Sequence, residues 1–295
     1  MRTMPTPRSI DSLLDIVDQV DAFFLDMFGV LWNGQSFYPE ALHVCQHLIQ
    51  KQKKVYVLTN TTILKKDFKE RYGKFGFIPN VHYTDIITSG DVLKFELDRH
   101  ALLDKITNSK DSRYFLIGCV SDVIFHKVIS RKTNDISQAS VVYFGVPLKF
   151  KNNKWVTVKS VRSFVPDLKQ ALQYHLPAIC ANPDYFAMKD KSKYITQGSL
   201  GKWYEKHKGK VYWIGKPYDQ LYMYALQKTK LSPKRCVMVG DTIRTDILGG
   251  KNAGMKTILI TGYGITHDRM QKGETLDQIA KQEKAYPDFL LSVLR

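Results

Sequence analysis

Apolar stretches of four or five residues alternate with helix-like segments in the first and last thirds of this 295-residue chain. Ala22–Leu25 is one such stretch, and Arg235–Val239, which is apolar after its first residue, is a second. Each is followed by a glycine within a few residues. Nearly continuous apolar runs of this length are typical of strands buried on both faces. The alternation predicts an α/β fold with a parallel sheet covered by helices.

Strands of a parallel sheet place functional side chains at their carboxyl ends. Four of the predicted strands run directly, or within two residues, into a polar or charged side chain. These residues are Asp26, Thr59, Lys216 and Asp241. We therefore expect the four side chains to lie together at one edge of the sheet.

The middle of the chain starts a separate series of strand and helix signals at Tyr114. A glycine-rich segment, Thr196–Gly201, is read as the loop that returns the chain to the first pattern. We predict a core formed by residues 1–100 and 205–295, with residues 101–204 inserted as a second α/β domain. Lys210–Ile214 is read as the first strand of the returning core.

The chain is strongly basic, with 44 Lys and Arg against 28 Asp and Glu, a net charge of +16. Such a surface attracts anions: phosphorylated metabolites, nucleic acids or acidic membranes. Residues 101–204 hold 16 of the basic and 7 of the acidic residues, so the excess is spread along the chain. We expect a small phosphorylated substrate and no specific nucleic acid. A homodimer remains open.

No run of about eighteen apolar residues is present, and the N-terminal segment has no continuous apolar stretch. We therefore predict no membrane span and no signal peptide. The four cysteines lie far apart without a Cys-x-x-Cys pair, which excludes a zinc ribbon and a thioredoxin-like site. A reducing cytoplasm is the expected location.

The four strand-end residues suit metal-assisted phosphoryl transfer. A carboxylate such as Asp26 can attack phosphorus as a nucleophile, and a hydroxyl and an ammonium, Thr59 and Lys216, can hold the phosphoryl oxygens. A second carboxylate, Asp241, would be repelled by the first unless a cation lay between them. Mg²⁺ prefers oxygen ligands of this kind. The pattern indicates transfer through an aspartyl phosphate with Mg²⁺ as cofactor.

Two local patterns bear on this interpretation. Pro217 suits the first residue of a helix, which would put Lys216 near a positive helix end that favours anions. The run Gly240–Asp246 places Asp241 and Asp246 five residues apart across the start of a helix. An N-cap Asp followed by a surface Asp is the alternative reading of that run.

Four segments of the chain together carry a family resemblance: Leu25–Gly34, Leu58–Thr61, Ile214–Pro217 and Val239–Asp246. They resemble the motifs of the haloacid dehalogenase (HAD) superfamily, specifically its class IIA branch of para-nitrophenylphosphatase-like and pyridoxal-phosphatase-like enzymes. Ala181–Asp184 is similar to the Thr-Asn-Pro-Asp segment of that branch. The resemblance implies a Rossmann-like core with residues 101–204 as a large inserted α/β cap.

The resemblance also implies roles for individual residues. Asp26 would be the nucleophile and a Mg²⁺ ligand, and Asp241 the second ligand. Asp246 would support the metal site from behind, and the backbone oxygen of Phe28 would be a further ligand.

The resemblance also implies which residues bind the phosphoryl group and the rest of the substrate. Thr59 and Lys216 would bind the phosphoryl group, and Asn60 would help to position the substrate. Asn182 would bind substrate from the cap, with Asp184 beside it.

The chain departs from the family pattern at Phe28. Phosphatases of the superfamily carry there a second Asp that protonates the leaving group, and a phenyl ring cannot carry a proton. Loss of a general acid–base commonly lowers the rate by a factor of about 10² to 10⁴. Two alternatives therefore stand beside a hydrolase of small phosphorylated metabolites. One is a weak or inactive protein that binds phosphorylated ligands, and the other is non-phosphatase HAD chemistry.

Two further patterns are interpreted as structural features and not as binding sites. His43 and His47 have the spacing of a helical metal pair but are expected on a solvated helix face. The aromatic residues between Trp203 and Trp213 are interleaved with lysines, as in base-stacking surfaces, but are expected to pack in the core and the hinge.

Overall fold

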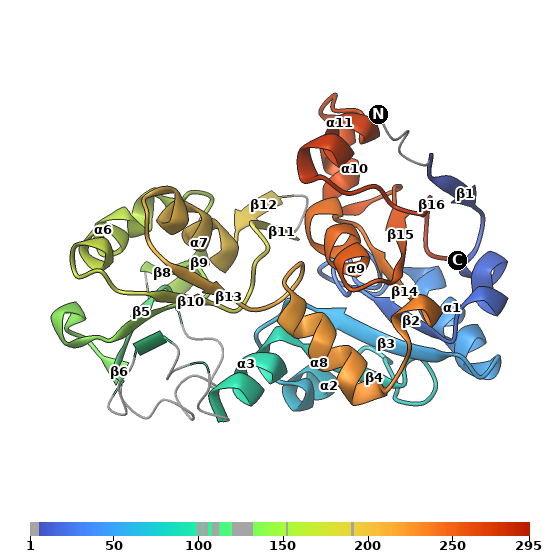
Figure 1. Ribbon diagram of the computed structural model, residues 1–295, viewed down its shortest axis with the longest axis horizontal. Helices are drawn as coiled ribbons and strands as arrows, with labels where there is room; N and C mark the ends of the chain where they lie inside the picture. The colour runs from blue at the N-terminus through green and yellow to red at the C-terminus, as the bar shows by residue number, and fades with distance from the viewer. Residues whose placement is uncertain are drawn as a thin grey trace. The chain divides into compact units, whose positions relative to one another are not determined.

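The computed structural model describes residues 6–98, 102, 106–107, 112–119, 132–151, 153–189 and 192–295. The chain divides into two compact units (Figure 1). Unit 1 holds Met1–Thr59, Lys66–Ile87 and Lys216–Arg295, and unit 2 holds Asn60–Lys65 and Thr88–Gly215. The chain therefore enters unit 2 at Asn60, returns to unit 1 for Lys66–Ile87, enters unit 2 again at Thr88 and leaves it directly before Lys216.

Unit 1 is built on a seven-stranded sheet in the order β1-β16-β15-β14-β2-β3-β4. Its strands are β1 (Arg8–Ile10), β2 (Ala22–Leu25), β3 (Lys54–Thr59), β4 (Asp85–Thr88), β14 (Cys236–Gly240), β15 (Lys256–Ile260) and β16 (Phe289–Leu291). The central strand β14 pairs in parallel with β2 and β15, and β2 pairs in parallel with β3. The predicted α/β fold with a parallel sheet is confirmed.

The helices of unit 1 lie between these strands in the chain. They are α1 (Pro39–Gln50), α2 (Lys65–Gly73), α8 (Asp219–Thr229), α9 (Leu248–Asn252), α10 (Gly264–Gln271) and α11 (Leu276–Glu283), with the 3₁₀ helices η1 (Leu13–Gln19) and η4 (Pro233–Arg235) and the π-helical turn η5 (Ile243–Ile247). Every residue of β2 and β14 is buried. Burial on both faces explains why these strands are continuous apolar runs instead of alternating ones.

Unit 2 has its own five-stranded sheet, in the order β13-β10-β7-β5-β6. Its strands are β5 (Tyr114–Ile117), β6 (Lys132–Thr133), β7 (Val141–Phe144), β10 (Ala178–Cys180) and β13 (Val211–Trp213). Two antiparallel hairpins are added, β8 (Leu148–Lys151) with β9 (Lys154–Thr157) and β11 (Phe186–Lys189) with β12 (Ser192–Ile195). The helices are α3 (Ser89–Asp98), α6 (Val165–Gln173) and α7 (Gln197–Lys206), with the turns η2 (Ile136–Gln138) and η3 (Val161–Phe164).

The strand predicted at Lys210–Ile214 forms, but it belongs to the other sheet. β13 pairs in parallel with β10 of unit 2, with Val211 opposite Ala178, and unit 1 resumes only at Lys216. An apolar run predicts a strand and says nothing about the partner strand, so the assignment to the core was wrong. Unit 2 thus extends beyond the predicted 101–204 at both ends, and the predicted boundary at residues 100–101 lies outside the described residues.

The predicted return loop at Thr196–Gly201 is helical from Gln197 onward, as the start of α7. Its glycines serve close packing. A methyl group at Gly198 would lie 2.3 Å from the carbonyl oxygen of Asp184, and one at Gly201 would lie 2.4 Å from the Trp213 ring. Among the described residues, no helix combines the length and the apolar character that a membrane span requires.

Candidate active site

The carboxyl ends of neighbouring strands in unit 1 carry three of the predicted site residues. Leu25 of β2 lies in register with Val239 of β14, so the residues that follow both strands share one edge of the sheet. Asp26 follows β2, and its N–H donates a hydrogen bond to the carbonyl of Val239 (2.9 Å). Thr59 ends β3, Asp241 follows β14, and both are buried.

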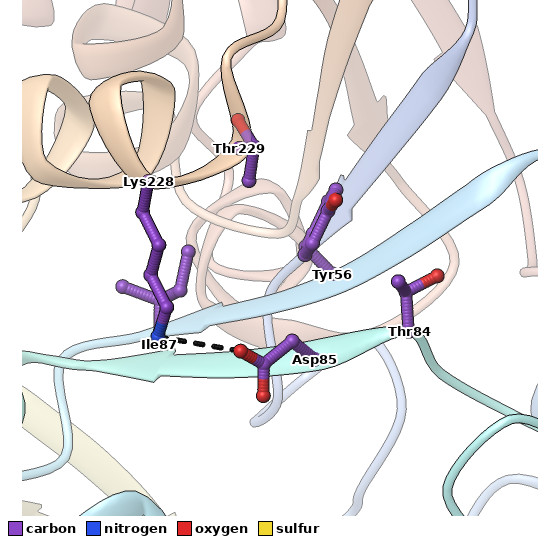
Figure 2. A pocket seen from close by; sticks show the side chains of 6 residues that line it. All are labelled: Tyr56, Thr84, Asp85, Ile87, Lys228 and Thr229. Carbon is purple, nitrogen blue, oxygen red and sulfur yellow. Dashed lines mark ion pairs between the residues drawn. The ribbon is translucent and has the colours of Figure 1, made fainter.

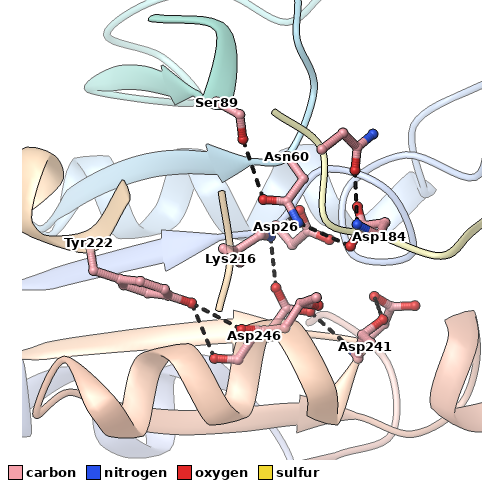
Figure 3. A network of polar contacts seen from close by, with 11 residues as sticks. Asp26, Asn60, Ser89, Asp184, Lys216, Tyr222, Asp241 and Asp246 are labelled. Carbon is pink, nitrogen blue, oxygen red and sulfur yellow. Dashed lines mark hydrogen bonds and ion pairs between the residues drawn. The ribbon is translucent and has the colours of Figure 1, made fainter. Parts of the chain in front are cut away.

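Asp26, Asp241 and Asp246 form a cluster of three carboxylates, hereafter the acidic cluster (Figure 3). Each side chain offers one oxygen, and these three atoms lie within 4.8 Å of one another. Asp241 and Asp246 are buried, and the side chain of Asp26 is 13% exposed. The cluster therefore has one member that solvent or a substrate can reach.

Lys216 lies against the acidic cluster. Its ammonium is 2.6 Å from Oδ1 of Asp26 and 2.7 Å from Oδ1 of Asp246, and its side chain is only 1% exposed. Helix α8 begins three residues later, at Asp219. The structure thus brings together Asp26, Lys216 and Asp241, three residues expected at one edge, and adds Asp246 to them.

Asp246 reaches the cluster through a π-helical turn. In η5 the N–H of Leu248 donates to the carbonyl of Ile243, five residues back instead of four. The N–H of Thr242 donates to Oδ2 of Asp246 (3.1 Å). A methyl group at Gly240 would lie 2.1 Å from Cβ of Asp246, so the close approach of this turn to the end of β14 requires glycine there.

Asp241 shows the electrostatic consequence of this crowding. Its burial and the neighbouring charge of Asp246 raise the pKa of Asp241 from 3.8 to about 7. Hydrogen bonds from the N–H of Ile265 and the hydroxyl of Thr242, and the charge of Lys216, act in the opposite direction. Three carboxylates against one ammonium leave an excess of negative charge in a buried place.

The acidic cluster has the chemistry of a divalent cation site. Carboxylate oxygens are the ligands that Mg²⁺ prefers, and a second cation would relieve the repulsion that raises the pKa of Asp241. Asp26 and Asp241 are the predicted ligands, with Asp246 behind them. The donor set fits the predicted Mg²⁺ cofactor.

Phe28 lies two residues after Asp26, and its side chain is 42% exposed. Its backbone forms an isolated bridge with Trp32, so the turn after β2 is tied to the chain that follows. An exposed aromatic ring, which cannot exchange a proton, therefore follows the predicted nucleophile. The backbone oxygen of Phe28 stays a predicted metal ligand.

The predicted substrate residues Asn60 and Asn182 belong to unit 2, where they form an amide cluster with Asp184 and Ser89. Figure 3 labels Asn60, Asp184 and Ser89. Asn60 donates to Oδ1 of Asp184 (3.0 Å), and its own Oδ1 accepts from the hydroxyl of Ser89 (3.4 Å). Oδ1 of Asn182 accepts from the N–H of Asp184 (3.0 Å). These contacts hold the turn of unit 2, and the roles of Asn60 and Asn182 in substrate binding stay predictions.

Two sequence patterns were interpreted as structural features, one on α1 and one within unit 2. His43 and His47 are exposed on α1. Within unit 2, the buried Tyr204 donates to the carbonyl of Leu176 (2.7 Å), and Trp213 donates from Nε1 to Glu205 (2.8 Å).

Unit 1 has a further pocket between β4 and α8 (Figure 2). Its lining residues are Tyr56, Thr84, Asp85, Ile87, Lys228 and Thr229. Asp85 is paired with Lys228 at 3.3 Å and with Lys69 at 3.7 Å. Because these pairs are partly exposed and sit beside the edge strand, they are typical of a charged edge that discourages strand pairing.

The sequence did not reveal the part that α10 plays. The N–H of Ile265 donates to Oδ2 of Asp241 (2.5 Å), and the N–H of Thr266 donates to its carbonyl (3.1 Å). Gly264, with a φ of +89°, opens the helix beside the same carboxylate. A glycine directly before a helical segment and shortly after a strand end was the only sequence signal for this contact.

Comparison with known proteins agrees with this architecture. Two family models match the chain: one described as haloacid dehalogenase-like hydrolase over residues 23–122, and one described as HAD-hydrolase-like over residues 213–289. Together they include the strand ends that carry Asp26, Thr59, Lys216 and Asp241.

Relatives and solved structures extend the likeness over most of the chain. The chain is 24% identical to phosphoglycolate phosphatase 2 of Arabidopsis thaliana, over 92% of this chain and 93% of that protein. It is 26% identical to the ribonucleotide monophosphatase NagD of Escherichia coli strain K12, over 80% and 85%. A haloacid dehalogenase-like hydrolase from Brucella suis superposes with a TM-score of 0.80 at 23% identity, covering 97% of this chain and 100% of that one. The chain belongs to the haloacid dehalogenase-like hydrolases, in their class IIA branch.

Proposed function

We propose that the protein is a Mg²⁺-dependent phosphatase of a small phosphorylated metabolite, of the sugar phosphate or nucleotide class. The observation that carries the proposal is the acidic cluster, in which three carboxylates meet one buried ammonium at the end of parallel strands. Two relatives are named as phosphatases of phosphoglycolate and of ribonucleotide monophosphates. Both names describe small phosphorylated substrates, which supports the same class for this chain.

The proposed reaction has two steps on Asp26. A carboxylate oxygen of Asp26 attacks the phosphorus, and the bond to the leaving oxygen breaks with its electron pair going to the leaving group. Water then attacks the aspartyl phosphate, which releases inorganic phosphate and restores the carboxylate. Lys216 and Thr59 hold the phosphoryl oxygens and offset their charge.

The cation in this proposal would be held by Asp26, Asp241 and the backbone oxygen of Phe28, with Asp246 supporting them. When bound, Mg²⁺ supplies charge neutralisation and polarises the phosphoryl group. Lys216 already bridges Asp26 and Asp246, so this ammonium keeps the carboxylate of Asp26 oriented. The side chain of Asp26 is the most accessible of the three carboxylates, as a nucleophile must be.

We further propose that the inserted residues act as the cap that selects the leaving group, with Asn60 and Asn182 in substrate binding. Their amides carry both donors and acceptors suited to a polar metabolite. We propose a cytoplasmic location, because all four cysteines are thiols and none forms a disulfide.

A second candidate function rests on Phe28. Because its ring supplies no proton, a protein that binds phosphorylated ligands with little turnover is the alternative to an efficient phosphatase. Leaving groups that depart without protonation, such as a nitrophenolate or the carboxylate of an acyl phosphate, are the least affected by Phe28.

The test is a screen for phosphate release from sugar phosphates, nucleotides, an acyl phosphate and para-nitrophenyl phosphate, each with Mg²⁺ and with EDTA. We expect Mg²⁺-dependent turnover that Asp26→Asn lowers by a factor on the order of 10⁴ or more, because the nucleophile is lost. Asp85→Asn, which changes a carboxylate outside the acidic cluster, is the matched control. Ligand binding by calorimetry without turnover would replace the phosphatase with the binding protein.

A further inference from the structure

We propose that Gly29 and Gly264 are positioning residues that form a slot for the carboxylate of Asp241 and thereby set its orientation for the cation. The proposal rests on the metal site of the proposed function. Gly29 comes from the turn after β2 and Gly264 from the start of α10, two segments that are more than 200 residues apart in the chain.

Both glycines approach the same oxygen of Asp241. A methyl group at Gly29 would lie 2.5 Å from Oδ2, and one at Gly264 would lie 2.2 Å from it. Contacts of a β-carbon below 3.0 Å are essentially never observed. Neither position can therefore take a side chain while Asp241 keeps its present rotamer.

Hydrogen bonds fix the carboxylate inside this slot. The N–H of Ile265 donates to Oδ2 at 2.5 Å, and the hydroxyl of Thr242 donates to Oδ1 at 3.0 Å. The N–H of Thr266 also donates to the carbonyl of Asp241 at 3.1 Å, which ties α10 to the end of β14. Asp241 is thus held from both sides before any cation arrives, and supports of this kind typically change metal affinity by a factor of about 10 to 100.

The chain supplies matched controls for both glycines. Gly29 has a φ of +77° and Gly76 a φ of +82°, and Gly264 has a φ of +89° and Gly273 a φ of +95°. All four carry the left-handed backbone that disfavours a side chain. A methyl group at Gly76 or Gly273, however, would have no heavy atom within 4 Å. Each control therefore reproduces the backbone strain without the clash on Asp241.

The experiment is titration calorimetry of the full chain with MgCl₂, on the wild type and on Gly29→Ala, Gly76→Ala, Gly264→Ala and Gly273→Ala. We expect the dissociation constant for Mg²⁺ to rise about tenfold or more in Gly29→Ala and Gly264→Ala. In the two controls we expect it to stay within about twofold of the wild type. Thermal unfolding in EDTA checks that all four variants fold. The two controls should lose stability through backbone strain alone, and Gly29→Ala and Gly264→Ala should lose more because of the clash with Asp241.

The outcomes separate the two proposals. A wild type that binds no Mg²⁺ would overturn the metal of the proposed function. A wild type that binds Mg²⁺, with Gly29→Ala and Gly264→Ala matching their controls, would overturn the slot alone. Should one of these two variants fail to fold, the other decides, because each clash comes from a different segment.

Discussion

The acidic cluster of unit 1 and the amide cluster of unit 2 are both built from polar side chains, yet they differ in charge balance. In the acidic cluster, three carboxylates share one ammonium, and the pKa of Asp241 is raised to about 7. In the amide cluster, Asn60 donates to Asp184 and accepts from Ser89, and Asn182 accepts from the N–H of Asp184.

The contrast shows which kind of buried polar cluster indicates a bound ligand. Hydrogen bonds among amides, a hydroxyl and one carboxylate, as in the amide cluster, stabilise local structure and concentrate little charge. A buried excess of one charge is costly unless a further partner is bound, so it points to a ligand of opposite charge. The following predictions test whether this difference between the clusters is real.

The largest gain in rate is expected from Phe28→Asp, which places a proton donor two residues after the proposed nucleophile Asp26. If the missing acid limits turnover, phosphate release from alkyl phosphates should rise by a factor of about 10² to 10⁴, with little gain on para-nitrophenyl phosphate. Phe75→Asp, which also changes an exposed phenylalanine of unit 1, should leave both rates unchanged. Equal rates for Phe28→Asp and wild type on alkyl phosphates would show that protonation is not limiting.

Removing the ammonium should unbalance the acidic cluster further. Lys216→Met leaves buried carboxylates without their partner, and we expect the free energy of unfolding in EDTA to fall by about 3–5 kcal/mol. Lys228→Met breaks the partly exposed pair with Asp85 and should cost about 1 kcal/mol or less. Urea unfolding measures the loss of unfolding free energy in each variant. Equal losses would mean that the ion pairs of Lys216 contribute no more to stability than the partly exposed pair of Lys228.

The raised pKa of Asp241 predicts a pH dependence of the metal-free protein. Between pH 4 and 7 the folded chain retains a proton that the unfolded chain has lost, since the unfolded pKa is near 3.8. The contribution of this group to stability is therefore most favourable below about pH 4 and is lost as the pH rises through 7, by a total on the order of 4 kcal/mol.

Urea unfolding in EDTA at pH 5 and pH 8.5 measures this effect when wild type is compared with Asp241→Asn. The difference between the two proteins should change with pH in EDTA and should change much less with saturating Mg²⁺, which favours the ionised carboxylate. A difference that is independent of pH in EDTA would contradict the raised pKa.

The smallest effect is expected in the amide cluster. Asn60→Asp replaces a donor with a carboxylate that faces Asp184, and should lower stability by about 1–3 kcal/mol. Asp184→Asn keeps an acceptor and should cost less. The double variant restores the hydrogen bond with its direction reversed, so it should recover most of the loss and leave the affinity for Mg²⁺ unchanged. A double variant as unstable as the sum of the two single changes would disprove the pairing.

The sequence predicted which residues lie at the carboxyl ends of the strands better than it predicted which strands pair with each other. Asp26, Thr59 and Asp241 follow buried apolar strands, and the rule that parallel strands end together was enough to group them. Lys216 was also expected there, although its strand, β13, belongs to the sheet of unit 2. Strand signals are local, whereas the choice of partner strand depends on the whole fold.

Local sequence patterns did not predict the hydrogen bonds and close contacts that hold Asp241. Gly264 and Ile265 act through a contact between the start of α10 and the end of β14, and neither residue has an unusual sequence context. For Asn60 and Asn182, in contrast, the sequence did suggest a role, but the structure does not test it. The family resemblance assigned them to substrate, while their described hydrogen bonds connect them within unit 2.

The π-helical turn at Ile243–Ile247 makes the active site sensitive to the number of residues as well as to their kind. This turn contains one residue more than a regular helical turn would. The additional residue lets the carboxylates of Asp241 and Asp246 both belong to the acidic cluster. Deleting a single residue between Thr242 and Asp246 would restore regular winding and rotate Asp246 by roughly 100° about the helix axis. We therefore expect a one-residue gap in this segment of a related sequence to separate the residue that corresponds to Asp246 from the other two carboxylates.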